Sequence, residues 1–294
     1  MASLKLWIQG ARVRTLPLAV APIALGAAVA STTDNLSLGL SLLALVVALA
    51  LQVGVNYAND YSDGIRGTDA NRVGPLRLTG SGSATPVAVK KAAFLSFGVA
   101  ALAGLLLIAF SGQFWLLAVG VASILAAWFY TGGKSPYGYS GFGEIAVFVF
   151  FGLVATIGTS FVQQGFISPL AVILGSASGF YACAVLLVNN IRDIKTDTES
   201  GKRTIAVKLG AKRSKRVFLW LVWLPVVLNL LLLVLWPATI LGLANLVFVI
   251  PLTIVLLNAK TPKELITVLK LTSFAGLGFG VLVGLGIFLV NLGL

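Results

Sequence analysis

The chain has 294 residues, of which 58% are hydrophobic and only 10% are charged, and its mean hydropathy is +1.00. An ordinary soluble domain carries about 25% charged residues, so this composition excludes a soluble globular fold and indicates an integral membrane protein. The net charge of +12 needs no nucleic acid to explain it, because basic residues also set membrane topology and attract anionic lipid headgroups. The sequence contains no His, which excludes a histidine-ligated metal site.

Nine apolar runs are long enough to cross a bilayer whose hydrocarbon core is about 30 Å thick. They lie near residues 15–32, 38–58, 91–110, 113–130, 142–163, 167–190, 217–235, 237–257 and 271–293. We therefore expect an all-α integral membrane protein with nine transmembrane helices, built as one domain over residues 1–294. Its longest polar segments fall near 59–90 and 191–216.

The basic residues test this count independently. All 21 Lys and Arg fall in alternate connections between the nine runs, counting the N-terminal segment. By the positive-inside rule, those connections lie in the cytoplasm. This predicts a multi-pass protein of the cytoplasmic membrane, with the N-terminus inside and the C-terminus outside.

Acidic residues are scarce and clustered. Six of the nine lie in two short segments, 59–69 and 193–199, and each segment follows a long apolar run. Carboxylates this sparse, at the ends of hydrophobic helices, indicate chemistry rather than solubility.

Helical spacing places the acids of each segment on one face, because residues three or four apart are neighbours on a helix. The two expected stripes are Asn56, Asp60, Asp63 and Asn189, Asp193, Asp197. Two such stripes facing each other would repel unless cations lay between them. Carboxylate and amide oxygens, without His or thiolate, are the ligands of Mg²⁺.

Basic residues are interleaved with these acids. The candidates for binding phosphate oxygens are Arg66, Arg72, Arg192, Lys202 and Arg203. In a diphosphate site, acidic side chains bind the metal, and the metal and basic side chains together bind the phosphate oxygens. For Glu199 and Lys195, ordinary pairing on a solvated loop is the better explanation.

Two sequence patterns resemble a known family. Asn59-Asp60-xx-Asp63 followed by Asp69, together with Asp193-xxx-Asp197-xxx-Gly201 and Thr204, is similar to the paired Asp-rich motifs of the UbiA-type intramembrane aromatic prenyltransferases. The resemblance covers the whole chain. The segments 12–17, 56–69 and 190–204 are most similar to the branch that prenylates 1,4-dihydroxy-2-naphthoate in menaquinone synthesis. One departure is that Asp69 follows Asp63 by six residues, where the family's third acid follows by four.

The resemblance implies helices around a central cavity, with both motifs at its cytoplasmic mouth and two Mg²⁺ ions bridging a polyprenyl diphosphate. The implied metal ligands are Asn59, Asp60, Asp63, Asp69, Asn189, Asp193 and Asp197. The allylic C1–O bond would ionise, the dihydroxynaphthoate ring would attack the cation, and loss of CO₂ would lead to demethylmenaquinone. The prenyl chain would lie between helices in the lipid bilayer.

The connection after the fourth apolar run supplies further candidates. The resemblance suggests that Lys134 contacts the diphosphate. Tyr130 could stabilise the cation through its ring face, although an interfacial aromatic is an equally good interpretation. Glu144 begins an apolar run and has two equal interpretations, a site residue or an interfacial acid.

Three alternatives remain open at this stage. CDP-alcohol phosphotransferases share the opening Asp60-xx-Asp63-Gly64, but the Ala-Arg that should follow is absent here. A transporter or cation channel would place its binding groups near the middle of the membrane, whereas these acids lie at one face. Within the UbiA family, the acceptor could instead be homogentisate, 4-hydroxybenzoate, haem or a chlorophyllide. The sequence does not indicate the prenyl chain length or the oligomeric state.

Overall fold

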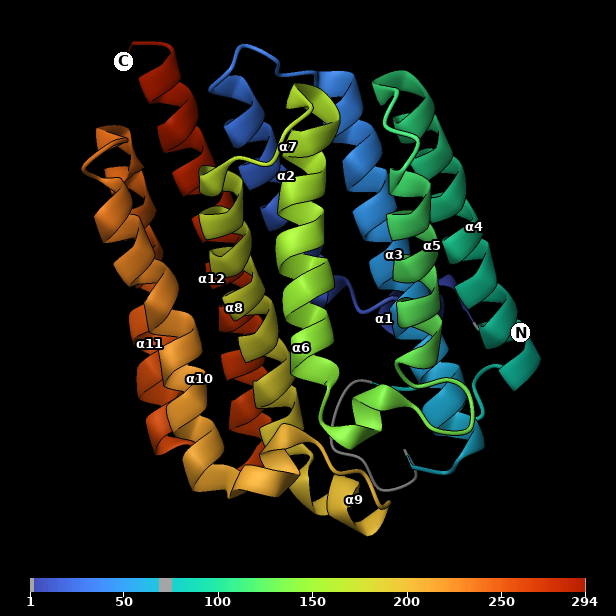
Figure 1. Cartoon of the computed structure of the whole chain (residues 1–294). Helices are drawn as coiled ribbons and strands as arrows, with labels where there is room; N and C mark the ends of the chain where they lie inside the picture. The colour runs from blue at the N-terminus through green and yellow to red at the C-terminus, as the bar shows by residue number, and fades with distance from the viewer. Residues whose placement is uncertain (1–2, 69–75, 294) are drawn as a thin grey trace.

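The computed structural model describes residues 3–68 and 76–293, and every regular element within them is helical (Figure 1). The elements in chain order are α1 (Leu4–Gly10), η1 (Val13–Thr15), α2 (Pro17–Ser31), α3 (Leu38–Ile65), α4 (Pro86–Ser111), α5 (Leu116–Phe129), η2 (Tyr137–Ser140), α6 (Gly143–Val147), η3 (Phe148–Val154), α7 (Ala155–Gln164), α8 (Pro169–Arg192), α9 (Ile194–Glu199), α10 (Ile205–Leu232), η4 (Pro237–Asn245), α11 (Leu246–Asn258) and α12 (Pro262–Asn291). The long helices run side by side, while α9 and the connection from α5 to α6 lie together at one end of the bundle.

The predicted all-helical membrane architecture is confirmed, but the count of nine spans is not exact. In the described part of the chain, seven helical segments are long and apolar enough to cross a membrane. An eighth span results if Leu4–Thr15 and α2, which meet at a 49° bend, are counted together. The remaining predicted span is α5, which has 14 residues. At 1.5 Å per residue it is about 21 Å long, short of a full crossing.

Local sequence signals explain where several of these helices begin. Thr85 and Ser168 each accept a hydrogen bond from a backbone N–H in the first turn, at 3.3 and 3.1 Å, and each is followed by proline. Thr261 forms a capping box with Glu264, also with proline at the first helical position. A side-chain acceptor followed by proline is a strong N-terminal signal, because proline lacks only an N–H that would be unsatisfied there.

Helix α8 is the centre of the bundle, since 72% of its most apolar stretch is buried. It packs against α2, α10, α12 and η3. Small residues allow the closest approaches: a Cβ on Gly152 would lie 2.5 Å from the Cα of Gly179, and one on Gly280 would lie 2.7 Å from the Cα of Ala21. Glycine therefore permits close helix packing between η3 and α8 and between α12 and α2.

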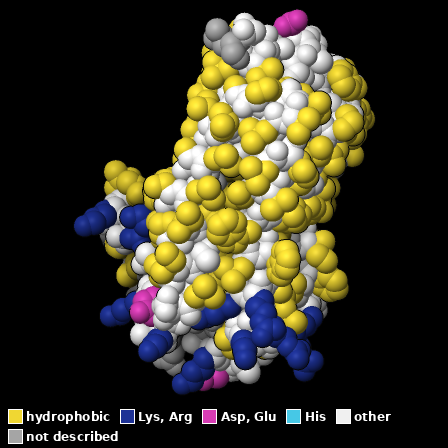
Figure 2. Space-filling view, turned by 90° about the vertical axis from the view of Figure 1, so that its left-hand side faces the viewer, with side chains coloured by type: hydrophobic (Ala, Val, Ile, Leu, Met, Phe, Trp, Pro, Cys, Tyr) yellow, Lys and Arg dark blue, Asp and Glu magenta, His cyan; other side chains and the backbone are white. Residues whose placement is uncertain are grey.

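The surface separates by charge along the length of the helices. Figure 2 shows a flank that is almost entirely hydrophobic, with Lys and Arg side chains gathered toward the lower end of the molecule. The lower end is also where α9 and the α5–α6 connection lie (Figure 1). An apolar belt with charge at one end is the surface expected of a multi-pass membrane protein.

The glycine contact between α12 and α2 predicts a stability effect. We expect Gly280→Val to lower the free energy of unfolding by about 1–3 kcal/mol, because the new side chain would meet backbone atoms of Ala21. Thermal denaturation of the detergent-solubilised protein would measure the change. Gly98→Val on α4 is the matched control, since a Cβ there meets nothing within 4 Å. Equal melting temperatures for the two variants would contradict this account.

Candidate active site

The two acidic segments of the sequence converge on one polar pocket of about 90 Å³. It lies where the ends of α3 and α8 meet the α5–α6 connection and the loop after α9. The sequence-predicted residues that line it are Asn59, Asp63, Tyr130, Asn189, Asp193, Asp197 and Lys202. Side chains separated by about 130 positions in the sequence are therefore brought to one small volume.

A larger cavity of about 440 Å³ adjoins this pocket. Its walls come from α2, α3, α4, α5, α8 and the segment 146–162, and they are mainly Ala, Leu, Val, Ile and Phe. Five residues line both spaces: Arg12, Asn59, Tyr130, Leu186 and Asn189. A polar pocket that leads into an apolar cavity suits a ligand with a charged head and a hydrocarbon tail.

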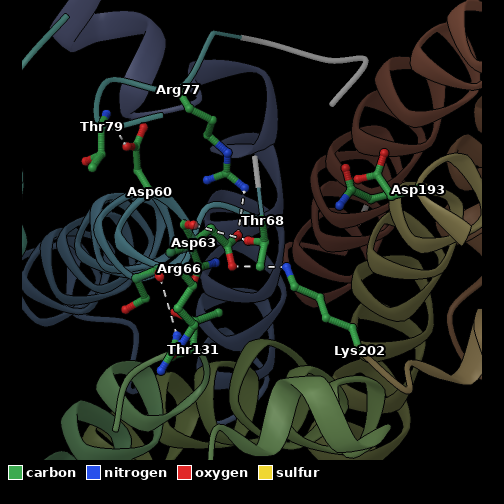
Figure 3. Close-up of polar contacts among 12 residues, drawn as sticks. Asp60, Asp63, Arg66, Thr68, Arg77, Thr79, Thr131, Asp193 and Lys202 are labelled. Atoms are coloured by element: carbon green, nitrogen blue, oxygen red, sulfur yellow. Dashed lines mark hydrogen bonds and ion pairs between the residues drawn. The ribbon is translucent and has the colours of Figure 1, made fainter. Parts of the chain in front are cut away.

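Asp63 is the most heavily contacted carboxylate of the first segment. Its oxygens lie 3.3 Å from Arg77 Nη2 and 3.0 Å from Lys202 Nζ (Figure 3). The Tyr139 hydroxyl donates a further hydrogen bond to it. The side chain is only 7% exposed. Burial and the Asp63 charge raise the pKa of Tyr139 above its usual range, so the phenol stays protonated and remains a donor.

Asp60 is turned away from Asp63 toward the chain that follows the first motif (Figure 3). Its two oxygens accept hydrogen bonds from the backbone N–H groups of Leu78 and Thr79, at 2.7 and 2.8 Å. It does not line the polar pocket, although it was predicted to be a metal ligand. In this conformation Asp60 secures the loop that carries Arg77.

Asp193 lies on the opposite side of the pocket from Asp63 (Figure 3). It ends α8 and pairs with the adjacent Arg192, with two contacts of 2.7 Å. Arg192 also donates to Asn189 Oδ1 at 2.7 Å. Asp197 follows on α9, one turn after Asp193, and its backbone N–H donates to the Asp193 carbonyl at 2.8 Å.

The remaining predicted diphosphate-binding residues are distributed differently. Arg66 donates to the carbonyls of Thr131 and Gly133, both at 2.5 Å, so it braces the α5–α6 connection. Lys134 and Arg203 are exposed and do not line the pocket. Asp69 and Arg72 lie outside the described residues.

Sequence reasoning missed several residues of the pocket, among them Arg12, Arg77, Thr131 and Tyr139. Thr131 donates to Asn59 Oδ1 at 2.8 Å and so orients an amide at the junction of the two cavities. Only Arg12 stood within a stretch that the family resemblance singled out, so the motif containing it was a signal. Arg77 lies in the polar connection that carries the first acidic segment, and Thr131 and Tyr139 lie in the connection after the fourth apolar run, but no motif marked these three residues themselves.

The donor chemistry of the pocket fits Mg²⁺, because its three carboxylates and three side-chain amides offer oxygen ligands. Within the described residues, however, no three acidic, His or Cys side chains are close enough together to form a ready-made metal site. Asp63 is instead paired with Lys202 and Arg77, and Asp193 with Arg192. Binding a metal would require these carboxylates to reorganise toward it.

The hydrogen bonds of Asp60 predict a structural effect for its removal. We expect Asp60→Ala to lower the free energy of unfolding by about 2–5 kcal/mol, because one buried and one partly buried backbone N–H group lose their acceptor. Thermal unfolding in detergent would measure it, with Glu199→Ala as the control because Glu199 is exposed. Unchanged stability would show that the loop does not depend on Asp60.

Comparisons with known proteins find relatives over most of the chain. The chain is 46% identical over 275 residues to the 1,4-dihydroxy-2-naphthoate octaprenyltransferase of Mycobacterium tuberculosis, and the matched region covers 94% of each protein. It is 40% identical over 219 residues to the enzyme of the same name from Escherichia coli, and the matched region covers 71% of this chain and 70% of that enzyme.

Solved structures share the fold at low sequence identity. A UbiA homologue from Archaeoglobus fulgidus, bound to GPP and Mg²⁺, superposes with a TM-score of 0.61 at 16% identity, covering 92% of this chain and 99% of the other. The apo structure of a UbiA homologue from Aeropyrum pernix K1 gives a TM-score of 0.62 at 15% identity, covering 92% and 97%.

The model of the UbiA prenyltransferase family matches residues 19–274, a range that includes both acidic segments and most of the cavity wall. With this match and the relatives above, the chain belongs to the UbiA prenyltransferase family.

Proposed function

We propose that this protein transfers a polyprenyl chain from polyprenyl diphosphate to 1,4-dihydroxy-2-naphthoate, with loss of diphosphate and CO₂, on the pathway to demethylmenaquinone. The single observation that carries the proposal is the polar pocket, lined by both acidic segments, that adjoins an apolar cavity of about 440 Å³. The acceptor rests on the relatives, since those at 46% and 40% identity carry this activity in their names.

Two Mg²⁺ ions are part of the proposal. Their candidate ligands are the pocket residues Asn59, Asp63, Asn189, Asp193 and Asp197, with Asp60 and Asp69 as outer members of the same motif. Bound Mg²⁺ neutralises the diphosphate and makes it a better leaving group. Lys202 and Arg77, now paired with Asp63, would become available to phosphate oxygens as Asp63 turns to a metal.

The protein's own residues organise the reaction around the junction of the two cavities. The polar pocket holds the diphosphate and the apolar cavity holds the first isoprene units, so the reacting C1 atom would lie near Tyr130 and Asn189. The C1–O bond breaks with its electrons on the diphosphate, and the ring carbon that bears the carboxylate forms the new bond to C1. The bond from that carbon to the carboxylate then breaks as CO₂ leaves, and its electrons restore the aromatic ring. The apolar walls exclude water that would otherwise capture the cation.

Tyr130 is suited to the cationic stage of this reaction. It lines both cavities, and its ring meets that of Tyr137 edge to face at 5.5 Å. Aromatic faces stabilise nearby cations without trapping them as a nucleophile would. Lys134 and Arg203, which are exposed in this structure, are secondary candidates for the diphosphate because they could reach it only after moving.

The defining test is an assay with radiolabelled prenyl diphosphate, dihydroxynaphthoate and Mg²⁺ in detergent. We expect a lipid-extractable product and release of CO₂, and we expect chelation of the metal by EDTA to abolish both. Absence of product with every prenyl length tried would refute the proposed function. Replacing dihydroxynaphthoate by 4-hydroxybenzoate tests the acceptor, and faster turnover with that compound would reassign it.

Substitutions at the pocket test the assignment of residues. We expect Asp63→Ala and Asp193→Ala each to reduce turnover by at least about 100-fold, because the metal that would hold the diphosphate loses an oxygen ligand. Glu199→Gln is the matched control: it removes an exposed carboxylate from the same acidic segment, and turnover should stay near wild type. Near-normal turnover by either Asp variant would contradict the site.

The position of the basic residues supports a cytoplasmic active site, with the N-terminus inside and the C-terminus outside. Cysteine labelling tests this orientation, because the native Cys183 is buried. An impermeant maleimide applied to intact cells should label Asn35→Cys but not Ser81→Cys, since these exposed residues lie at opposite ends of α3 and its following loop. The reverse pattern would place the site on the outer face.

A further inference from the structure

Arg12 holds an unusual place in the molecule, because it lines both the polar pocket and the apolar cavity. The Nη2 atom of its guanidinium is buried. Among the described residues, Arg12 is the only Lys, Arg, Asp or Glu on the wall of the apolar cavity. A single cation therefore faces the space that would receive the acceptor ring.

The backbone at Arg12 adopts an unusual conformation that neighbouring hydrogen bonds hold in place. Arg12 has a φ of 53°, in the left-handed region that is unfavourable for a residue with a branched or bulky side chain. Its carbonyl accepts hydrogen bonds from the backbone N–H and the hydroxyl of Thr15, at 2.9 and 3.0 Å. A strained conformation persists only where the surroundings over-determine it.

Helix α3 supplies that support through three side chains. Gln52 donates to the Thr15 carbonyl at 3.0 Å, Asn56 to the Ala11 carbonyl at 2.9 Å, and Tyr57 to the Trp7 carbonyl at 2.9 Å. These bonds fix the N-terminal segment on both sides of Arg12. Asn56, which helical spacing placed in a metal-binding stripe, instead directs its amide N–H to this segment.

We propose that Arg12 is the residue that binds the carboxylate of the aromatic acceptor and so determines the preference for an acidic aromatic substrate. The inference rests on the proposed function and extends it to the acceptor, whose binding residues no sequence motif identified. The carboxylate must enter a largely apolar space, and an unpaired charge there is strongly disfavoured. A guanidinium binds a carboxylate through two parallel hydrogen bonds and fixes the plane of the ring as well.

The location favours the acceptor carboxylate over the diphosphate as the anion that Arg12 binds. The polar pocket already contains Arg77 and Lys202, together with three carboxylates that can hold metal for a diphosphate. The apolar cavity offers no second cation among its described residues. An acceptor placed at the junction would have its carboxylate on Arg12 and its ring beside Tyr130.

Steady-state kinetics of Arg12→Gln test the inference. We expect the KM for dihydroxynaphthoate to rise by about 10- to 100-fold, because a hydrogen-bonded charge pair is lost, while the KM for prenyl diphosphate changes by less than about 2-fold. The inhibition constant of 1,4-dihydroxynaphthalene, which lacks the carboxyl group, should be unchanged. Arg12→Lys keeps the charge and should recover part of the affinity.

Arg14→Gln is the matched control, because Arg14 lies two residues away on the same segment and is exposed. Its kinetic constants should equal those of the wild type. Circular dichroism and thermal unfolding of Arg12→Gln check that the helices remain folded.

Three results would overturn the inference. The first is an unchanged KM for dihydroxynaphthoate, and the second is a rise in the KM for prenyl diphosphate, which would assign Arg12 to the donor. The third is an equal loss of affinity for 1,4-dihydroxynaphthalene, which would indicate a general structural role. Failure of the wild-type protein to prenylate dihydroxynaphthoate is a separate outcome that refutes the proposed function and the inference together.

Discussion

The interaction on which the site depends is the pairing of Asp63, at the end of α3, with Lys202, which follows α9. The two residues are 139 positions apart, and both side chains are largely buried. A buried carboxylate without a partner would be strongly destabilising, so this pair holds the two acidic segments together across one small pocket. The same pair keeps the Lys202 ammonium beside the Asp63 oxygens that would bind a metal. Metal binding would therefore change the contacts of both side chains.

Around the pocket, side chains of the same type have different roles: some hold loops in place and others face the pocket. Asp60 and Asp63 lie on the same helix end, yet Asp60 accepts backbone hydrogen bonds from Leu78 and Thr79 while Asp63 faces the pocket. Arg66 likewise braces the α5–α6 connection, whereas Arg77 reaches Asp63. Residues that hold the loops and residues that face the ligand are therefore interleaved along one short stretch of sequence.

Hydrophobic length and charge distribution predicted the helical membrane fold well, because membrane insertion is governed by those two properties. Spacing also predicted that Asp63, Asp193 and Asp197 would meet, since each extends the face of a long helix. The bend before α2 and the shortness of α5 were not predictable from hydropathy, which does not register where a helix ends within an apolar run. Periodicity could not separate Asp60 from Asp63 either, because the difference arises from a loop that returns to Asp60 from 18 positions away.

The short helix α5 has a consequence for the surrounding lipid. All of its residues remain at least partly exposed, and several of them line the apolar cavity. A segment about 21 Å long in a hydrocarbon layer of about 30 Å creates a mismatch that neighbouring phospholipids relieve by thinning. The bilayer beside α5 should therefore be locally thinner. A thinner bilayer shortens the path by which a long isoprenoid could enter the protein laterally from the membrane. Bilayer thickness thus becomes a variable that could tune how readily the substrate enters.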